Sequence, residues 1–331
     1  MKIAILDDYQ DSVRHLDCFS LLEQHEVKVF NNSARGLGQL AIRLASFDAL
    51  VPIRERTVFS RALLAKLPKL KLISQTGRVG GYIDMAAATA AGIAIAEGAG
   101  DPTAPAELTW ALIMAAMRKI PQYAANLKHG HWQSVALDPA RNVLGTVLKG
   151  KTLGIWGYGR IGRLVAGYGS AFGMPVLVWG RDASLEAAAR DGHRVAGSKQ
   201  ELFGTSDVLT LHLRLTDATR GIVTAQDLAA MKPDALFVNT SRAELLPPGA
   251  LQQALAQGRP GGAALDVFEQ EPLPNESPLL QMPNVLATPH IGYVEKNSYE
   301  NYFRAAFENL INFADGRPSG LLNPEALQNR G

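Results

Sequence analysis

A glycine-rich turn between a strand and a helix constrains this chain more than any other feature. The stretch KTLGIWGYGRIG contains a short apolar strand, Thr152–Trp156, followed by G-x-G-x-x-G at Gly157, Gly159 and Gly162. In such a turn the first glycine permits a tight bend and the second lets the backbone approach a pyrophosphate. The third glycine lets the next helix pack closely, and the free N–H groups of that helix favour negative charge.

The pattern alone is weak evidence, because a glycine-rich turn that binds nothing has the same letters. Its surroundings are more specific. A helical run, Ile161–Phe172, follows the glycines, and a second apolar strand, Val176–Trp179, follows the helix. This β-α-β unit has the length of a dinucleotide-binding unit, so the sequence predicts that the turn binds a dinucleotide.

Composition narrows the class of protein. A chain of 331 residues with 47% hydrophobic and 19% charged residues suggests two globular domains with sizeable cores. The formal net charge of +2, without a basic run, argues against nucleic-acid binding. The single cysteine, Cys18, excludes an internal disulfide, and no Cys/His cluster has zinc spacing, so we expect no metal site. His129 and His131 are expected to lie in a surface loop.

The N-terminus, MKIAILDDYQ, has the pattern of a strand rather than of a signal peptide. No uninterrupted apolar run reaches the roughly 18 residues that a membrane span needs. The longest apolar helix, Leu108–Met117, is therefore expected to be buried in protein. A cytoplasmic location and no membrane partner are the default expectations.

Both halves of the chain alternate short apolar strands with helical stretches, which predicts an α/β fold with two doubly wound parallel sheets. In the first half we expect strands at Lys2–Leu6, Asp48–Ile53, Leu70–Gln75 and Ile93–Ala96. After the glycine turn we expect them at Val176–Trp179, His193–Ala196, Val208–Leu213, Ala235–Asn239, Ala263–Asp266 and Val285–Ala287. The final helix, Asn297–Phe313, has no strand after it and is expected to return to the first domain.

Three ionisable residues follow ends of the late strands. Arg242 follows Ala235–Asn239, Glu271 follows Ala263–Asp266, and His290 follows Val285–Ala287. In an open α/β sheet, ligands bind at the carboxyl ends of the strands. The three side chains are therefore expected to converge on one site, although each of them alone is as consistent with a structural histidine or a solvated charge.

These residue types suit hydride transfer to a 2-keto acid. Reduction of a ketone needs a proton for the oxygen, and a histidinium such as His290 supplies one near neutral pH. A carboxylate such as Glu271 beside the imidazole favours its charged form and fixes its tautomer. The guanidinium of Arg242 can hold a carboxylate at two points and polarise the carbonyl.

The cofactor remains open between NAD and NADP. In NAD-binding folds an acidic residue usually ends the second strand and binds the ribose, but here Gly180 stands at that position. Arg181 follows at once and can pair with a 2′-phosphate, which slightly favours NADP. Asp182 can instead reach the ribose, or both residues can be solvated parts of a turn.

Over nearly its whole length the chain resembles the D-isomer-specific 2-hydroxyacid dehydrogenases. The resemblance rests on LGIWGYGRIG, LHLRLTDATRGIV, FVNTSRAELL, AALDVFEQEPLP and TPHIG, in this order and spacing. It implies a Rossmann cofactor domain at 101–292 and a flavodoxin-like substrate domain at 1–100 plus 293–331. It also implies a homodimer built around the helix 104–120 and the arm 129–149.

The resemblance also implies a set of site residues. The catalytic residues would be Arg242 as the carboxylate and carbonyl ligand, Glu271 as the orienting base and His290 as the acid/base. The cofactor would be bound by Gly157, Gly159, Arg160, Ile161, Gly162, Gly180, Arg181, His212, Leu213, Thr240, Ser241, Asp266 and Gly292. The substrate carboxylate would be bound by a loop containing Gly77, Arg78, Val79 and Gly80.

Arg78 is unusual, since many relatives carry a small residue there. We hypothesise that it favours substrates with a second acidic group, while a solvent-facing Arg78 is equally consistent with the sequence. The chain is thus expected to be an NAD(P)-dependent dehydrogenase acting on a small 2-hydroxy or 2-keto acid. The alternatives are a nucleotide-sensing binding protein like the corepressors of this family, or oxidation of formate or phosphonate on the same scaffold.

Overall fold

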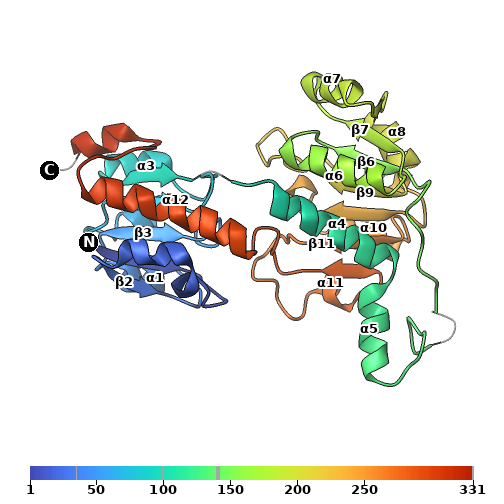
Figure 1. Cartoon of the computed structure of the whole chain (residues 1–331), viewed down its shortest axis with the longest axis horizontal. Helices are drawn as coiled ribbons and strands as arrows, with labels where there is room; N and C mark the ends of the chain where they lie inside the picture. Colours follow the sequence, from blue (N-terminus) through green and yellow to red (C-terminus); the bar gives the residue numbers. More distant parts are fainter. Residues whose placement is uncertain (35, 99, 139–141, 330–331) are drawn as a thin grey trace. The chain divides into compact units, whose positions relative to one another are not determined.

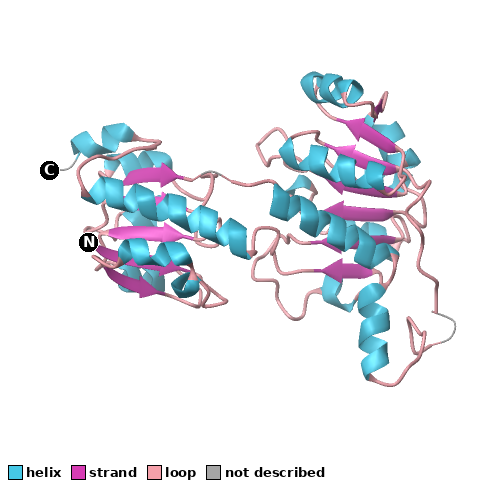
Figure 2. Ribbon diagram, in the orientation of Figure 1, coloured by secondary structure: helices cyan, strands magenta, loops and turns pink. Residues whose placement is uncertain are grey.

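The computed structural model describes residues 1–34, 36–98, 100–138 and 142–329. The chain divides into two units, each built around its own sheet (Figure 1). The first unit contains Met1–Asp101 and Val294–Gly331, and the second contains Pro102–Tyr293. Both sheets are parallel with flanking helices (Figure 2), which confirms the predicted α/β class.

The sheet of the first unit has five strands in the order β2-β1-β3-β4-β5, the flavodoxin-like order. The strands are β1 (Lys2–Leu6), β2 (Glu26–Val29), β3 (Ala49–Pro52), β4 (Leu72–Gln75) and β5 (Ala94–Glu97). The α-helices are α1 (Leu37–Leu44), α2 (Arg61–Leu64), α3 (Met85–Ala90) and α12 (Lys296–Ala314). Three 3-10 helices complete the unit: η1 (Val13–His15), η2 (Asp17–Leu22) and η5 (Pro324–Asn329).

Helix α12 belongs to this first unit, although it lies at the other end of the sequence. Its buried face includes Phe303, Phe307 and Leu310, and the hydroxyl of Ser74 in β4 donates to the carbonyl of Ala306 at 2.8 Å. Helices α1, α2 and α3 contribute to a separate apolar cluster around Leu50. The sheet is therefore covered by helices on both faces, as strands buried on both sides require.

The sheet of the second unit has seven strands in the order β12-β11-β10-β9-β6-β7-β8. Counted from its first strand this is the doubly wound 3-2-1-4-5-6 order with one further strand beyond it. The strands are β6 (Leu153–Trp156), β7 (Val176–Trp179), β8 (Arg194–Val195), β9 (Val208–Leu211), β10 (Leu236–Asn239), β11 (Gly262–Leu265) and β12 (Val285–Ala287). The direction of the chain reverses across the sheet between β6 and β9, where such folds bind ligands.

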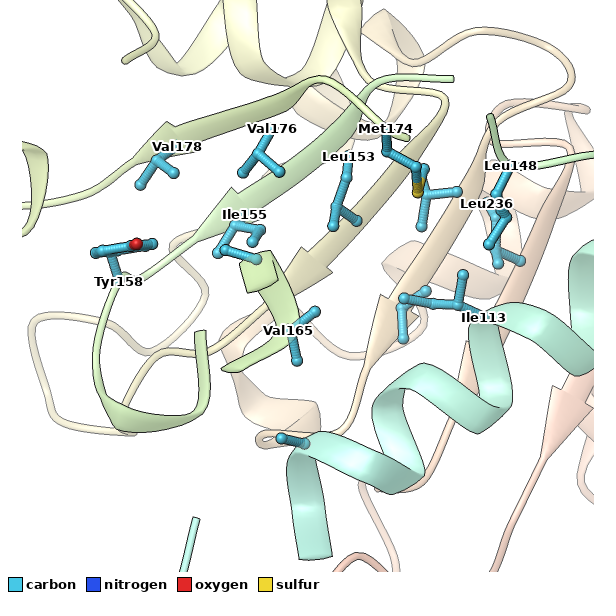
Figure 3. Close-up of a cluster of buried hydrophobic side chains, with 14 of the residues drawn as sticks. Ile113, Leu148, Leu153, Ile155, Tyr158, Val165, Met174, Val176, Val178 and Leu236 are labelled. Carbon is cyan, nitrogen blue, oxygen red and sulfur yellow. The ribbon is translucent and has the colours of Figure 1, made fainter. Parts of the chain in front are cut away.

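Helices cover this second sheet on both faces. The helices of this unit are α4 (Thr103–Met117), α5 (Ile120–Lys128), α6 (Arg160–Ala171), α7 (Asp182–Arg190), α8 (Lys199–Thr205), α9 (Ala225–Ala230), η4 (Ala243–Leu245), α10 (Ala250–Ala256) and α11 (Pro278–Gln281). One core joins the sheet to α4, α6 and α7, and includes Ile113, Val165 and Ile155 (Figure 3). A second core on α8, α9 and α10 includes Phe203 and Phe237.

Helix α4 is apolar on most of its circumference, and Pro105 lies in its first turn, where a missing N–H costs no hydrogen bond. Leu112 and Ile113 are buried in the core of the second unit. The segment after α5 carries exposed apolar side chains, among them Trp132 at 77% and Leu144 at 87% exposure. Part of the predicted arm 129–149, residues 139–141, lies outside the described residues.

Candidate active site

The turn from β6 into α6 leaves room for a phosphate group at a helix N-terminus. Gly157 has a φ of +102°, and a Cβ there would lie 2.5 Å from the carbonyl oxygen of His212. A Cβ on Gly162 would overlap the carbonyl oxygen of Gly157, so α6 begins in contact with the turn. Around the Cβ position of Gly159, by contrast, no heavy atom lies within 4 Å. This open backbone fits the pyrophosphate of a dinucleotide.

Arg160 and Ile161 form the first turn of α6, directly after Gly159. The side chain of Arg160 is exposed, whereas Ile161 packs partly against the core. Arg160 thus places a positive charge beside the N–H groups that begin the helix, where an anion is favoured.

The residues after β7 lie next to this turn. A Cβ on Gly180 would be 3.9 Å from Cα of Gly157 and 3.3 Å from Cβ of Ser184. Arg181 is the N-cap residue of α7, and both Arg181 and Asp182 are exposed. The absence of a side chain at Gly180 therefore leaves Arg181 and Asp182 as the charged residues beside the expected position of the ribose.

His212 follows β9 on the other side of the turn. Its N–H donates to the carbonyl of Trp156 at 2.8 Å, and its Nε2 lies 3.2 Å from the hydroxyl of Thr210. Burial lowers the pKa of His212 to about 4, because the charged imidazolium loses its hydration. The lowered pKa favours the neutral form of His212 near pH 7. Leu213 beside it packs partly into the core.

A tight polar turn after β10 carries Arg242. The side chain of Asn239 accepts the N–H of Ser241 at 3.0 Å and donates to the carbonyl of Arg242 at 2.8 Å. The hydroxyl of Ser241 donates to the carbonyl of Leu211 at 2.6 Å. The hydroxyls of Thr240 and Thr109 lie 2.7 Å apart, which ties the turn to α4. Asn239 is 2% exposed, so a buried amide fixes the backbone that presents Arg242.

His290 and Glu271 form a close pair after β12 and β11. Nδ1 of His290 lies 2.6 Å from Oε2 of Glu271, whose Oε1 accepts the N–H of Phe268 at 3.0 Å. Because an ionised carboxylate only accepts hydrogen bonds, Nδ1 carries the proton of this contact. The pairing leaves Nε2 as the nitrogen that can exchange a proton with a ligand.

Asp266 holds the backbone that follows His290. Its carboxylate accepts the N–H groups of Ile291 and Gly292, both at 2.8 Å, and the hydroxyl of Thr288 at 2.7 Å. Burial is the largest influence on Asp266 and raises its pKa, while the hydrogen bonds oppose that shift. Asp266 is 1% exposed, so in this structure its contacts are with the chain itself.

The sheet order brings these groups to adjacent strand ends. Strands β12, β11 and β10 are neighbours, so His290, Glu271 and Arg242 follow three successive strands along one edge. Strand β9 then leads to β6 and the glycine turn. A paired histidine, an arginine and a glycine-rich turn at a helix N-terminus thus share the carboxyl edge of one sheet.

The predicted substrate loop lies in the first unit, after β4. Gly77 has a φ of +84°, and a Cβ there would overlap Nη1 of Arg54. Oε2 of Glu97, the last residue of β5, accepts the N–H of Val79 at 2.9 Å. Arg78 is exposed. A Cβ on Gly80 would lie 3.1 Å from Cε1 of Tyr82.

The described ranges of the chain contain no group of three or more His, Cys, Asp or Glu side chains that could hold a metal ion. No helix within those ranges is both long and apolar enough to cross a bilayer.

Three residues with contacts in these turns, Arg54, Glu97 and Asn239, were not predicted from the sequence. Glu97 carried a usable signal, because it directly follows the predicted strand Ile93–Ala96 at its carboxyl end. Asn239 was treated as the end of a strand, and its side-chain contacts depend on the turn that follows. Arg54 gave no signal, since its place over Gly77 depends on a left-handed backbone with a φ of +53°.

Comparison with protein families identifies the second unit. Residues 110–292 match the family model described as D-isomer specific 2-hydroxyacid dehydrogenase, NAD binding domain. The matched range covers more than half of the chain and includes the glycine turn as well as Arg242, Glu271 and His290.

Individual relatives agree with this family. The glyoxylate reductase of Aeropyrum pernix is 38% identical over 81% of each chain. The D-3-phosphoglycerate dehydrogenase of Methanocaldococcus jannaschii is 38% identical over 88% of this chain but only 53% of its own length. A solved oxidoreductase from Ralstonia solanacearum has 60% identity and a TM-score of 0.96, covering 99% of this chain and 98% of the other.

Proposed function

Because the chain belongs to the D-isomer-specific 2-hydroxyacid dehydrogenase family, an NAD-dependent group of oxidoreductases, we propose that it interconverts a small 2-keto acid and its D-2-hydroxy acid. The contact of 2.6 Å between His290 and Glu271 carries this proposal. It supplies a proton-exchanging group at the same sheet edge as a turn with room for a pyrophosphate.

Each group has a defined task in the reductive direction. A nicotinamide cofactor held at the glycine turn Gly157–Gly162 would supply the hydride for C2 of the keto acid. His290 donates the proton from Nε2 to the carbonyl oxygen, so that the C=O bond becomes CH–OH. Glu271 holds Nδ1 and stabilises the imidazolium before transfer. In the oxidative direction Nε2 takes the proton of the hydroxyl instead.

Arg242 holds the carboxylate and polarises the carbonyl of the substrate. Asn239 keeps its backbone in place through two hydrogen bonds. Asp266 keeps Ile291 and Gly292 in place behind His290, which we propose as its main contribution to the site.

The cofactor preference depends on the residues after β7. Gly180 supplies no carboxylate for the ribose, and Arg181 at the start of α7 can pair with a 2′-phosphate, which favours NADP. Asp182 beside it opposes that charge. We propose that both cofactors are accepted with a lean to NADP. A preference for NADH of more than about 100-fold, or roughly 2.7 kcal/mol, would refute the role of Arg181.

We propose that the first unit binds the substrate through the loop Thr76–Gly81. Glycines let the backbone approach an anion, and the guanidinium of Arg54 next to Gly77 adds a positive charge. Arg78 adds a second charge, which suits a substrate with a second acidic group. Replacement of Arg78 by Ala should then lower the rate on dianionic keto acids more than that on monoanionic ones. Unchanged relative rates on the two classes would refute a role of Arg78 in favouring a second acidic group.

A homodimer is proposed from the apolar surface of the second unit. Leu144 at 87% and Val147 at 66% exposure lie in the segment that follows α5 in the chain, and Leu127 in α5 is 56% exposed. Such a density of exposed apolar side chains marks an interaction surface. Sedimentation at micromolar concentration should give twice the mass of the chain, and a monomer would refute the proposal.

The reaction itself is tested with purified protein, NADH or NADPH and a panel of keto acids. Glyoxylate, hydroxypyruvate and 3-phosphohydroxypyruvate distinguish the activities that the relatives' names describe. We expect cofactor oxidation with at least one of the small keto acids and a D-hydroxy acid as the product. Binding of cofactor without oxidation by any of these substrates would favour a nucleotide-sensing protein.

A further inference from the structure

The loop Thr76–Gly81 already binds a carboxylate that belongs to the chain itself. Oε2 of Glu97 accepts the N–H of Val79 at 2.9 Å. The proposed function places the carboxylate of a 2-keto acid on this same loop. A side chain with the charge and shape of that substrate group therefore occupies one of the backbone donors of the loop.

Glu97 is held in this position by the fold. It is the last residue of β5, paired in register with Gln75 at the end of β4, immediately before the loop. The side-chain amide of Asn309 in α12 donates to the carbonyl of Glu97 at 3.3 Å. The backbone of Glu97 is thus fixed on both sides, and its carboxylate lies where β4 passes into the loop.

Charges of both signs surround the loop. Nη1 of Arg54 lies over Gly77, and the backbone N–H of Arg54 donates to the hydroxyl of Thr76 at 3.0 Å. The carboxylate of Glu55 lies 3.4 Å from the Cβ position of Gly80. An incoming carboxylate would therefore meet attraction from Arg54 and repulsion from Glu97 and Glu55, because like charges at close range disfavour each other.

We infer that Glu97 is a specificity-determining residue whose carboxylate opposes the binding of a substrate carboxylate on the loop Thr76–Gly81. This inference rests on the proposed function for the location of the substrate. Glu97 weakens the binding of small monocarboxylates, for which the loop is the main anchor in this unit. It leaves the catalytic step unchanged, because His290, Glu271 and Arg242 belong to the other unit.

The substitution Glu97→Gln separates charge from hydrogen bonding. The glutamine oxygen can still accept the N–H of Val79, so the loop keeps its support while the negative charge is lost. We expect the KM for glyoxylate or hydroxypyruvate to fall about tenfold, equivalent to about 1.4 kcal/mol, with less than about a twofold change in kcat. An unchanged or higher KM would overturn the inference.

Two further variants serve as controls. Asp48 lies at the opposite, amino edge of the same sheet, where its Oδ2 accepts the N–H of Lys2 at 2.8 Å. Asp48→Asn removes a carboxylate charge from a similar hydrogen bond and should leave the KM unchanged. Glu97→Ala removes the acceptor as well as the charge. If Glu97 only shaped the loop, Glu97→Ala alone would raise the KM, and Glu97→Gln would match the wild type.

A binding measurement separates this inference from the proposed reaction. Calorimetry with oxamate, an unreactive carboxylate, in the presence of NADH reports on the loop without turnover. Tighter binding to Glu97→Gln than to the wild type or Asp48→Asn supports the inference even if no keto acid is reduced. Equal or weaker binding to Glu97→Gln overturns it, even if the reductase activity is present.

Discussion

At the scale of single residues, His290 has a backbone conformation that side chains rarely adopt, with a φ of +52°. Such a conformation costs about 1–3 kcal/mol and persists where the surroundings enforce it. Asp266 provides that support by accepting the N–H groups of Ile291 and Gly292. The sequence indicated His290 and Glu271 by their position after strands, but neither the φ nor the support from Asp266 can be read from residue types alone.

The two later glycines of the turn differ in a way that mutation can separate. Around Gly159 there is open space, so Gly159→Ala should leave the melting temperature almost unchanged but weaken NADH binding by at least about tenfold, because its methyl group meets the pyrophosphate. Gly162→Ala should lower the melting temperature, since its Cβ overlaps the backbone of Gly157. Fluorescence titration and thermal unfolding check both variants. Normal NADH affinity in Gly159→Ala would contradict the placement of the phosphate.

At the scale of elements, a side-chain bridge connects the glycine turn to α7. The ring of Tyr158 packs beside Val178 and Ile155 (Figure 3), and its hydroxyl donates to Asp191, the C-cap residue of α7, at 2.8 Å. Burial and the neighbouring Asp191 raise the pKa of Tyr158 to about 12, so this donor keeps its proton at neutral pH. The bridge links the turn that faces the phosphates to the helix that begins after Arg181.

We predict that Tyr158→Phe destabilises the second unit by about 1–2 kcal/mol, toward the lower end for a hydrogen bond to a charged group because Asp191 is partly exposed. Asp191→Asn keeps an oxygen that can accept the hydroxyl of Tyr158, so it should lower the free energy of unfolding by less than Tyr158→Phe does. Denaturant unfolding measures both. An unchanged free energy of unfolding in Tyr158→Phe would show that the hydroxyl contact is not a source of stability.

Most elements were predictable because their periodicity is clear, but β2 was missed. Its four residues, Glu26–Val29, lie at the edge of the first sheet, with Glu26 and Lys28 exposed, Val27 partly buried and Val29 buried. The sequence EVKV therefore lacks the continuous apolar run that marks the buried strand β3. Its pairing with β1 depends on tertiary contacts that the local sequence does not encode.

At the scale of the whole molecule, stability should depend on pH through His212. The pKa of His212 is about 4 in the folded chain, against an ordinary value of 6.5. As the pH falls, His212 therefore takes up a proton in the unfolded chain before it does so in the folded chain. Stability is therefore lost between about pH 6.5 and about pH 4, by at most roughly 3 kcal/mol for this one group.

His212→Gln removes this titration. Thermal unfolding across that pH range should show a shallower fall in melting temperature for His212→Gln than for the wild type. The comparison of slopes cancels the other titrating groups, which both proteins share. Parallel curves for the two proteins would mean that His212 is not buried in its neutral form.

The α/β class, with two parallel sheets, was predictable from the alternation of strands and helices. The glycine turn indicated which of the two sheets belongs to the cofactor-binding domain. The order of the strands did not follow from the residues alone, because register and neighbours are set by packing between distant segments. That order is what brings the ends of β10, β11 and β12 together, and with them Arg242, Glu271 and His290.

The most direct test of the proposed chemistry is the turnover of His290→Gln with a keto acid that the wild type reduces, measured together with its affinity for NADH. Glutamine cannot become a cation or donate a proton as an acid, so we predict that kcat falls by roughly 10²-fold or more. The dissociation constant for NADH should stay within about twofold, because the glycine turn is unchanged. Turnover near that of the wild type, with normal NADH affinity, would contradict the role of His290 as the proton donor.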